Sequence, residues 1–172
     1  MLRIVGALLV MAGSGGFGLL FANGLADRAA TLRRLVTALQ HLESDINFAT
    51  LPLLMALRRV AATVGGVEGA FFAAAAEEIG ASEGRPLAAA WLTALNRHKL
   101  DMLLAPGEVD ALAQLGTVLG GSDREDQLKH LALAKATLTQ YHTEAEARAE
   151  KTKRVWRYLG FTLGALIVVL LY

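Results

Sequence analysis

The densest group of residues that could do chemistry lies between Gly120 and Ala134, in the sequence GGSDREDQLKHLALA. Nine consecutive positions of this stretch hold a serine, three carboxylates, an arginine, a lysine and a histidine. Acids, bases and a hydroxyl so close together could support general acid–base or nucleophilic catalysis. The same residues could instead begin a helix against which another protein docks.

Part of this stretch has the pattern of a helix start. Ser122 and Glu125 have the spacing of a capping box, in which the serine accepts a free backbone N–H bond and the glutamate reaches back to the cap. Asp123 and Asp126 would add negative charge at the positive end of the helix dipole. Capping leaves four polar residues of the stretch unexplained: Arg124, Gln127, Lys129 and His130.

Other patterns that carry chemistry are weak. None of the four histidines stands four residues from another, the spacing that would place two metal ligands on one helix face. His130 follows Asp126 by four residues, which is typical of a surface pair on a solvated helix. The chain has no cysteine, and this excludes thiolate catalysis and cysteine metal sites. We therefore predict no enzymatic activity, no cofactor, no metal and no small-molecule substrate.

The charge and hydrophobic content place the protein at a membrane instead. The net charge is +1, and no basic pattern with interleaved aromatics indicates nucleic acid binding. Hydrophobic residues make up 54% of the chain and charged residues 19%, which is more apolar than a typical soluble domain. The excess lies at the two ends. Residues 4–22 carry no charge and are long enough to cross about 30 Å of hydrocarbon.

These features predict an N-terminal transmembrane helix over residues 1–25, a central domain over 26–154 and a C-terminal transmembrane helix over 155–172. A cleaved signal peptide ending near Gly24–Ala26 is the alternative at the N-terminus, and a half-buried helix is the alternative at the C-terminus. Lys and Arg gather on the inner flanks of both spans, at 28, 33, 34, 148, 151, 153, 154 and 157. The positive-inside rule then places the central domain in the cytoplasm.

The central segment reads as helices throughout. Leu32, Leu35, Leu39, Leu42 and Ile46 recur at helical spacing. Further helices are predicted from Pro52 to the Gly65–Gly66 pair, over 68–79, from Pro86, over 106–119 and from Ser122 onward. Trp91 is expected in the core. The predicted fold is an all-α antiparallel bundle of about six helices between two transmembrane helices, with the last bundle helix continuing into the C-terminal span.

Three segments of the chain resemble the stage III sporulation protein AB family. They are ALQHLESDI at 38–46, TLPL at 50–53 with Ala56–Leu57, and above all LGGSDREDQLKHL at 119–131. The order of span, helical domain and span also matches, so the resemblance covers essentially the whole chain. One departure is that the family tends to place Thr directly before Pro, whereas Leu51 intervenes here.

The resemblance implies a location and a role. The family belongs to a channel between mother cell and forespore, and its members sit in the mother-cell membrane around the forespore. The helical domain is similar to that of inner-membrane platform proteins of type II secretion and type IV pilus machines. By that analogy it would couple a cytoplasmic secretion-type ATPase to other channel subunits, and a homo-oligomer is allowed.

Two further functions compete with this one. The first is a signalling or regulatory membrane protein whose long last helix transmits a state across the bilayer, although the chain has almost nothing outside to act as a sensor. The second is a membrane-bound hydrolase that uses Asp126 and His130. For the platform, the exposed helix start is the expected docking edge, and its predicted partner-binding residues are Asp123, Arg124, Glu125, Gln127, Lys129 and His130.

Overall fold

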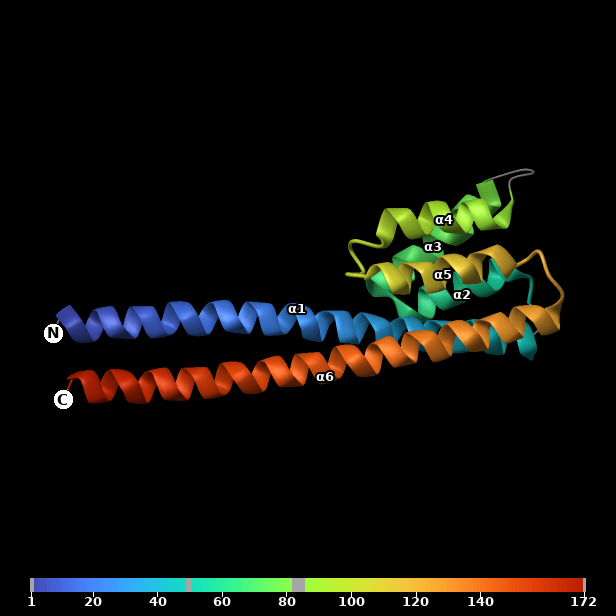
Figure 1. The fold of residues 1–172 in the computed structure, drawn as a ribbon. Helices are drawn as coiled ribbons and strands as arrows, with labels where there is room; N and C mark the ends of the chain where they lie inside the picture. Colours follow the sequence, from blue (N-terminus) through green and yellow to red (C-terminus); the bar gives the residue numbers. More distant parts are fainter. Residues whose placement is uncertain (1, 49–50, 82–85, 172) are drawn as a thin grey trace. The chain divides into compact units, whose positions relative to one another are not determined.

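In the computed structural model, the described residues 2–48, 51–81 and 86–171 form six helices and no strands (Figure 1). Side chains are described within these ranges from residue 24 onward, except at 25, 157, 160, 161 and 163–171. The helices are α1 (Leu2–Asn47), α2 (Leu53–Val64), α3 (Gly66–Ala81), α4 (Leu87–His98), α5 (Pro106–Val118) and α6 (Arg124–Leu171). The predicted all-α fold with about six helices is confirmed.

The chain divides into two compact units. Residues 1–29 and 143–172 form one, and residues 30–142 form the other, which we call the helical domain. The predicted boundaries between the transmembrane helices and the central domain, after residues 25 and 154, concern insertion into a membrane. They stay a prediction.

Among the residues whose side chains are described, no helix has an apolar stretch long enough to cross a membrane. The predicted spans at 1–25 and 155–172 fall largely on residues whose side chains lie outside the described ones.

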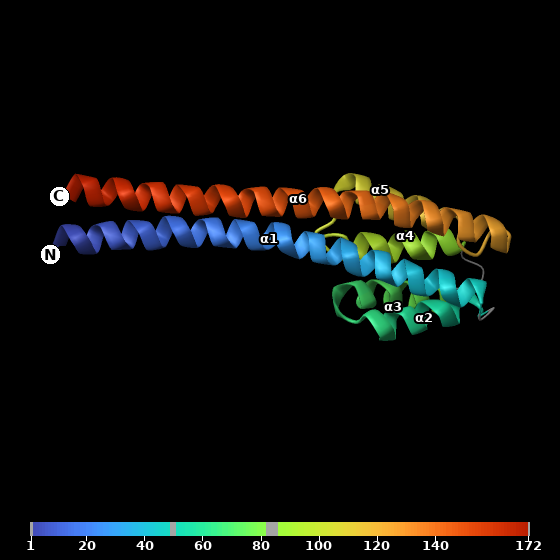
Figure 2. The same ribbon diagram turned by 90° about the horizontal axis from the view of Figure 1, so that it is seen from below.

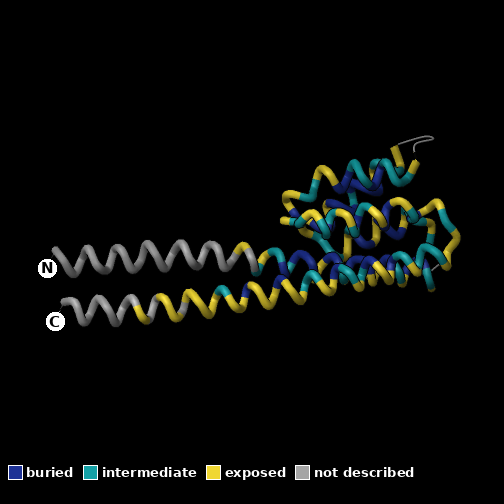
Figure 3. The backbone as a smooth tube through the Cα atoms, in the orientation of Figure 1, coloured by how far each residue is buried: buried dark blue, intermediate teal, exposed yellow. Residues whose placement is uncertain are grey.

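The first predicted helical stripe forms one side of the core of the helical domain. Leu32, Leu35, Leu39 and Leu42 of α1 are completely buried, and Ile46 is 7% exposed. They recur every three or four residues, so they share one face of the helix. Burying each leucine contributes about 1.5–3 kcal/mol. Figure 3 shows the buried residues gathered along this part of α1 and among α2 to α5.

Helices α2 to α5 pack in chain order, α2 on α3, α3 on α4 and α4 on α5 (Figures 1 and 2). An aromatic cluster lies at the centre of this stack. The rings of Phe71 and Phe72 on α3 lie 4.9 and 6.0 Å from the ring of Trp91 on α4. Trp91 is fully buried, as predicted, and its Nε1–H donates to the carbonyl oxygen of Leu112 on α5 at 2.8 Å.

The turn between α2 and α3 consists of two glycines. Gly65 and Gly66 both have φ of +62°, a left-handed conformation that costs a residue with a Cβ atom energy. The Gly65 N–H donates to Ala61 O at 3.1 Å and so ends α2. The predicted stop at this pair is therefore confirmed, and α3 begins at once with Gly66.

Within the helical domain, α6 lies antiparallel to α1 (Figures 1 and 2). Leu131 and Leu138 on α6 are fully buried, and Ala134 between them is 5% exposed. An ion pair between Lys135 and Glu43 joins the two helices. The α6 helix continues without interruption to Leu171, as expected for a segment with no Pro or Gly before Gly160.

Candidate docking site

The start of α6 is capped by Asp123 and not by Ser122. Oδ1 of Asp123 accepts the N–H of Asp126 at 2.8 Å, and α6 begins at Arg124. The predicted capping box of Ser122 with Glu125 is therefore wrong by one residue. A charged carboxylate at the positive end of the helix dipole is at least as good a cap as a hydroxyl. Ser122 instead donates its hydroxyl to Val118 O at the end of α5, at 3.0 Å.

Two of the predicted docking residues hold this turn together. Nη2 of Arg124 donates to Oδ1 of Asn47 at 3.3 Å and so joins the start of α6 to the end of α1. Nε2 of Gln127 donates to the carbonyl oxygen of Ser122 at 2.9 Å. Each bond uses one of the N–H groups that the side chain could otherwise offer to a partner. Arg124 and Gln127 thus have structural roles that the sequence pattern did not reveal.

A shallow hollow of about 240 Å³ lies on the outer side of this first turn of α6. Its lining consists of Asp123, Glu125, Asp126 and Lys129. Glu125 and Lys129 are exposed, and Lys129 forms no salt bridge with a described residue. The hollow therefore presents both signs of charge to solvent.

His130 lies beside a second and larger depression. Its Nε2 is 3.6 Å from Oδ1 of Asp126, with the histidine side chain 27% exposed and the aspartate 42%. This is the surface pair expected from the spacing. His130 also lines the α5–α6 groove, a depression of about 400 Å³ between these two helices. The groove is lined by Gly107, Asp110, Ala111, Gln114 and Leu115 of α5 and by His130, Leu133, Ala134, Thr137 and Tyr141 of α6.

Four of the six predicted docking residues border one of two neighbouring depressions. Asp123, Glu125 and Lys129 border the hollow, whereas His130 borders the α5–α6 groove. The structure adds Leu133, which is 54% exposed one turn after Lys129. The sequence could have indicated this exposure. Leu131 and Leu133 are two residues apart on one helix, so both cannot face the core of the helical domain.

Tyr141 of α6 is one of the residues that line the α5–α6 groove. Its hydroxyl occupies space that a side chain at position 107 would need, since a Cβ atom on Gly107 would lie 2.4 Å from it. On another part of the helical domain, Phe48 follows α1 and is 82% exposed, and Met55 on α2 is 51% exposed. The sequence pattern singled out neither Phe48 nor Met55, and no motif marks them.

The acidic and imidazole groups of the site are few and lie apart from any metal-binding arrangement in the described part of the chain. Among the described residues, no group of three His, Asp or Glu side chains could hold a metal ion. Asp126 and His130 lie on the outer surface of one helix without a nucleophile between them. The hollow and the α5–α6 groove present charged side chains and the exposed Leu133 to solvent.

Comparison with known proteins points to a family. The family model described as stage III sporulation protein AB matches residues 3–172. Stage III sporulation protein AB of Bacillus subtilis (strain 168) is 30% identical over 172 residues, which cover 99% of each chain. A solved structure of stage III sporulation protein AB is similar with a TM-score of 0.67 at 28% identity. That match covers 72% of this chain and 97% of the solved chain.

Proposed function

Because this chain belongs to the stage III sporulation protein AB family, we propose that it is a non-enzymatic platform subunit of a channel between mother cell and forespore. In this role it couples a cytoplasmic secretion-type ATPase to the membrane complex, whose other channel subunits are further partners. The observation that carries the proposal is the exposed surface at the start of α6. It combines unpaired charge with an exposed leucine and a groove, and it lacks the elements of a catalytic site.

The proposed location is the mother-cell membrane around the forespore. Both ends of the chain are anchored, through residues 1–25 and 155–172, and the helical domain lies in the cytoplasm. The uncharged run at 4–22 and the excess of Lys and Arg on the inner flanks support this topology. A cytoplasmic helical domain is the part of such a protein that an ATPase can reach.

The proposed docking surface joins the hollow to the adjoining part of the α5–α6 groove. Lys129 and Leu133 are four residues apart on α6 and both exposed, so they lie on the same face. His130 lies between the hollow and the groove, with Asp126 on one side and the groove on the other. An exposed apolar residue can bury area against another protein, and a neighbouring cation that no described residue pairs can supply a charge contact.

A binding measurement tests the proposal. The purified full chain in detergent is titrated with the ATPase of the same sporulation system, first as wild type and then with Lys129→Glu combined with Leu133→Ala. We expect about tenfold weaker binding or more, because removing a few central residues usually accounts for most of an interface. Helix content and thermal stability should be nearly unchanged, since both side chains are exposed.

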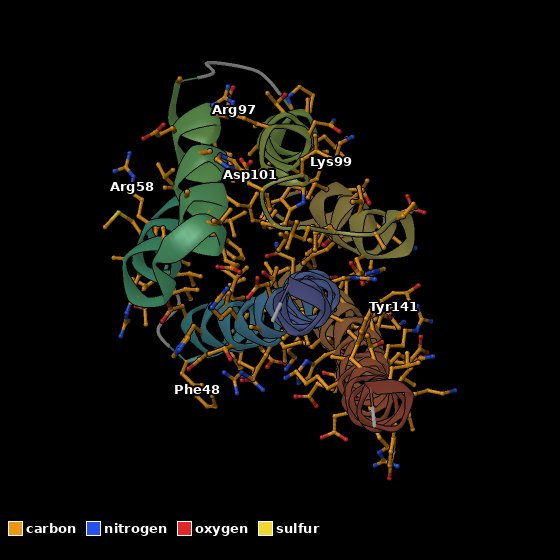
Figure 4. All side chains as sticks on the ribbon, turned by 90° about the vertical axis from the view of Figure 1, so that its left-hand side faces the viewer. Phe48, Arg58, Arg97, Lys99, Asp101 and Tyr141 are labelled. Atoms are coloured by element: carbon orange, nitrogen blue, oxygen red, sulfur yellow. The ribbon has the colours of Figure 1, made fainter. Side chains whose placement is uncertain are left out.

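The matched control is Arg58→Glu on α2. Arg58 is also exposed, forms no salt bridge with a described residue, and lies on the other side of the helical domain from Tyr141 (Figure 4). It should bind the ATPase as the wild type does. If the Lys129→Glu, Leu133→Ala variant binds the ATPase as tightly as the Arg58→Glu variant, the start of α6 is not the docking surface. Absence of binding by the wild type would contradict the ATPase coupling itself.

A further inference from the structure

A segment of α6 carries three cations that form no salt bridge with the described residues. Lys151, Lys153 and Arg154 are exposed, and none forms a salt bridge with a described residue. One turn earlier the situation differs, since Nη2 of Arg148 lies 3.6 Å from Oε2 of Glu144. From position 151 to the end the sequence has no Asp or Glu. Within the described part of the chain, the positive charge of this segment is therefore exposed and available to a partner.

Apolar and aromatic side chains follow these cations directly. Val155 and Leu159 are 49% and 45% exposed, and Trp156 and Tyr158 are 37% and 67% exposed. In a protein surrounded only by water such a run would leave much apolar area in solvent. Aromatic rings next to Lys and Arg are instead characteristic of the zone where a membrane meets water.

The spacing along the helix fits this zone. Lys153 and Tyr158 are five residues apart, which is about 7–8 Å along an α-helix. The polar layer on each side of the hydrocarbon core is roughly 5–8 Å thick. The cations thus reach the depth of lipid phosphates when the aromatic rings lie at the edge of the hydrocarbon.

We propose that Lys151, Lys153 and Arg154 form a basic collar that binds the headgroups of anionic phospholipids. The inference rests on the proposed membrane attachment of this end of α6, and it adds a lipid partner of defined charge. Charge complementarity selects the occupant, because three neighbouring cations attract anionic headgroups and gain little from zwitterionic ones. The exposed apolar run beside them favours a lipid over an acidic protein.

The chain contains its own reporter for this test. Of its two tryptophans, Trp91 is buried in the helical domain and Trp156 lies in the aromatic run next to the collar. The full chain is reconstituted into vesicles of phosphatidylcholine with a minor amount of phosphatidylglycerol. Bromine on the acyl chains quenches tryptophan fluorescence. In one set of vesicles phosphatidylglycerol is brominated and in the other phosphatidylcholine, with the same mole fraction of brominated lipid in both. A Trp156→Phe variant gives the fluorescence of Trp91 alone, which is subtracted.

We expect brominated phosphatidylglycerol to quench Trp156 about twofold or more above brominated phosphatidylcholine, because each cation near an anionic headgroup adds to the local enrichment of that lipid. Added salt should reduce the excess, since these charges are exposed and screened. Replacing all three cations (Lys151→Gln, Lys153→Gln, Arg154→Gln) should abolish it. Arg148→Gln, the matched control, should keep it, because Arg148 is paired within the helix.

The outcomes separate the collar from the membrane attachment. Equal quenching of the wild type by both lipids, or an excess that salt does not reduce, overturns the collar while the anchored helix stands. Quenching by neither lipid overturns the membrane attachment of this segment and the collar with it. If the triple variant fails to insert into the vesicles, the wild type alone tests the collar. Its excess quenching by brominated phosphatidylglycerol must then fall as salt is added.

Discussion

The indole ring of Trp91 occupies the space that a side chain at position 116 would need. A Cβ atom on Gly116 would lie 2.0 Å from Cδ1 of Trp91, which no packing adjustment of a few tenths of an ångström relieves. The ring is held in place by its hydrogen bond to Leu112 O and by its contacts with the rings of Phe71 and Phe72. The glycine thus allows α4 and α5 to approach each other closely.

Replacing Gly116 by alanine should therefore destabilise the helical domain. We expect a loss of at least roughly 1–3 kcal/mol, the usual cost of forcing an extra group into a close-packed core. Thermal unfolding of the full chain in detergent, followed by circular dichroism, measures it. Gly121→Ala is the control, because nothing lies within 4 Å of a Cβ atom there. A Gly116→Ala variant as stable as the control would contradict this packing.

A buried ion pair joins α1 to α3. Nε of Arg34 lies 3.0 Å from Oε1 of Glu68, with the arginine side chain 50% exposed and the glutamate 1%. The separation is that of an ion pair, but the N–H does not point at the oxygen, so no hydrogen bond forms. Glu68 also lies in the first turn of α3, where the helix dipole favours negative charge. Arg34 is nevertheless its only counter-charge among the described residues.

Arg34→Ala should cost roughly 1–3 kcal/mol of stability, less than the ~3–5 kcal/mol typical of wholly buried pairs, because half of Arg34 is in water. Adding Glu68→Gln to this variant should recover part of the loss, since it removes the uncompensated charge. The control is Arg33→Ala, which removes an exposed neighbour on the same helix. Chemical denaturation of the wild type, Arg34→Ala, Glu68→Gln and the double variant gives the coupling energy. A loss no larger for Arg34→Ala than for Arg33→Ala would rule out the pair as a stabilising contact.

The position of the α6 cap is open to a direct comparison. Asp123→Ala removes the acceptor of the Asp126 N–H and should cost about 0.5–2 kcal/mol. Ser122→Ala removes only a hydroxyl that donates to Val118 O, a carbonyl at the end of α5, and should cost less. Thermal unfolding of the two variants ranks them. The reverse order would restore the capping box of Ser122 and Glu125.

Much of the fold could be predicted because periodicity marks the buried face of a helix. The stripe from Leu32 to Ile46 and the burial of Trp91 follow from spacing and residue type alone. Periodicity does not say which helix a face meets. The fit of Trp91 against Gly116 and the burial of Glu68 therefore depend on contacts between segments far apart in the sequence.

The candidate site was predicted less well than the fold. Its place on the chain and its exposed residues Glu125 and Lys129 agree with the expected charged helix start. The shift of the cap from Ser122 to Asp123 could not be foreseen, because both residues are good caps and only the geometry of the preceding turn decides. The bond from Arg124 to Asn47 depends on the end of α1 lying beside the start of α6.

The proposed role requires above all that the helical domain lie in the cytoplasm. The chain has no cysteine, so a single Thr63→Cys substitution on the exposed surface of α2 creates one reactive thiol. Its labelling by a membrane-impermeant maleimide is measured in intact, non-sporulating cells that express the chain in their cell membrane, and in the same cells opened by detergent. We predict labelling only after the membrane is opened. Equal labelling in intact cells would place the helical domain outside the cytoplasm and contradict both the two-anchor topology and docking of a cytoplasmic ATPase.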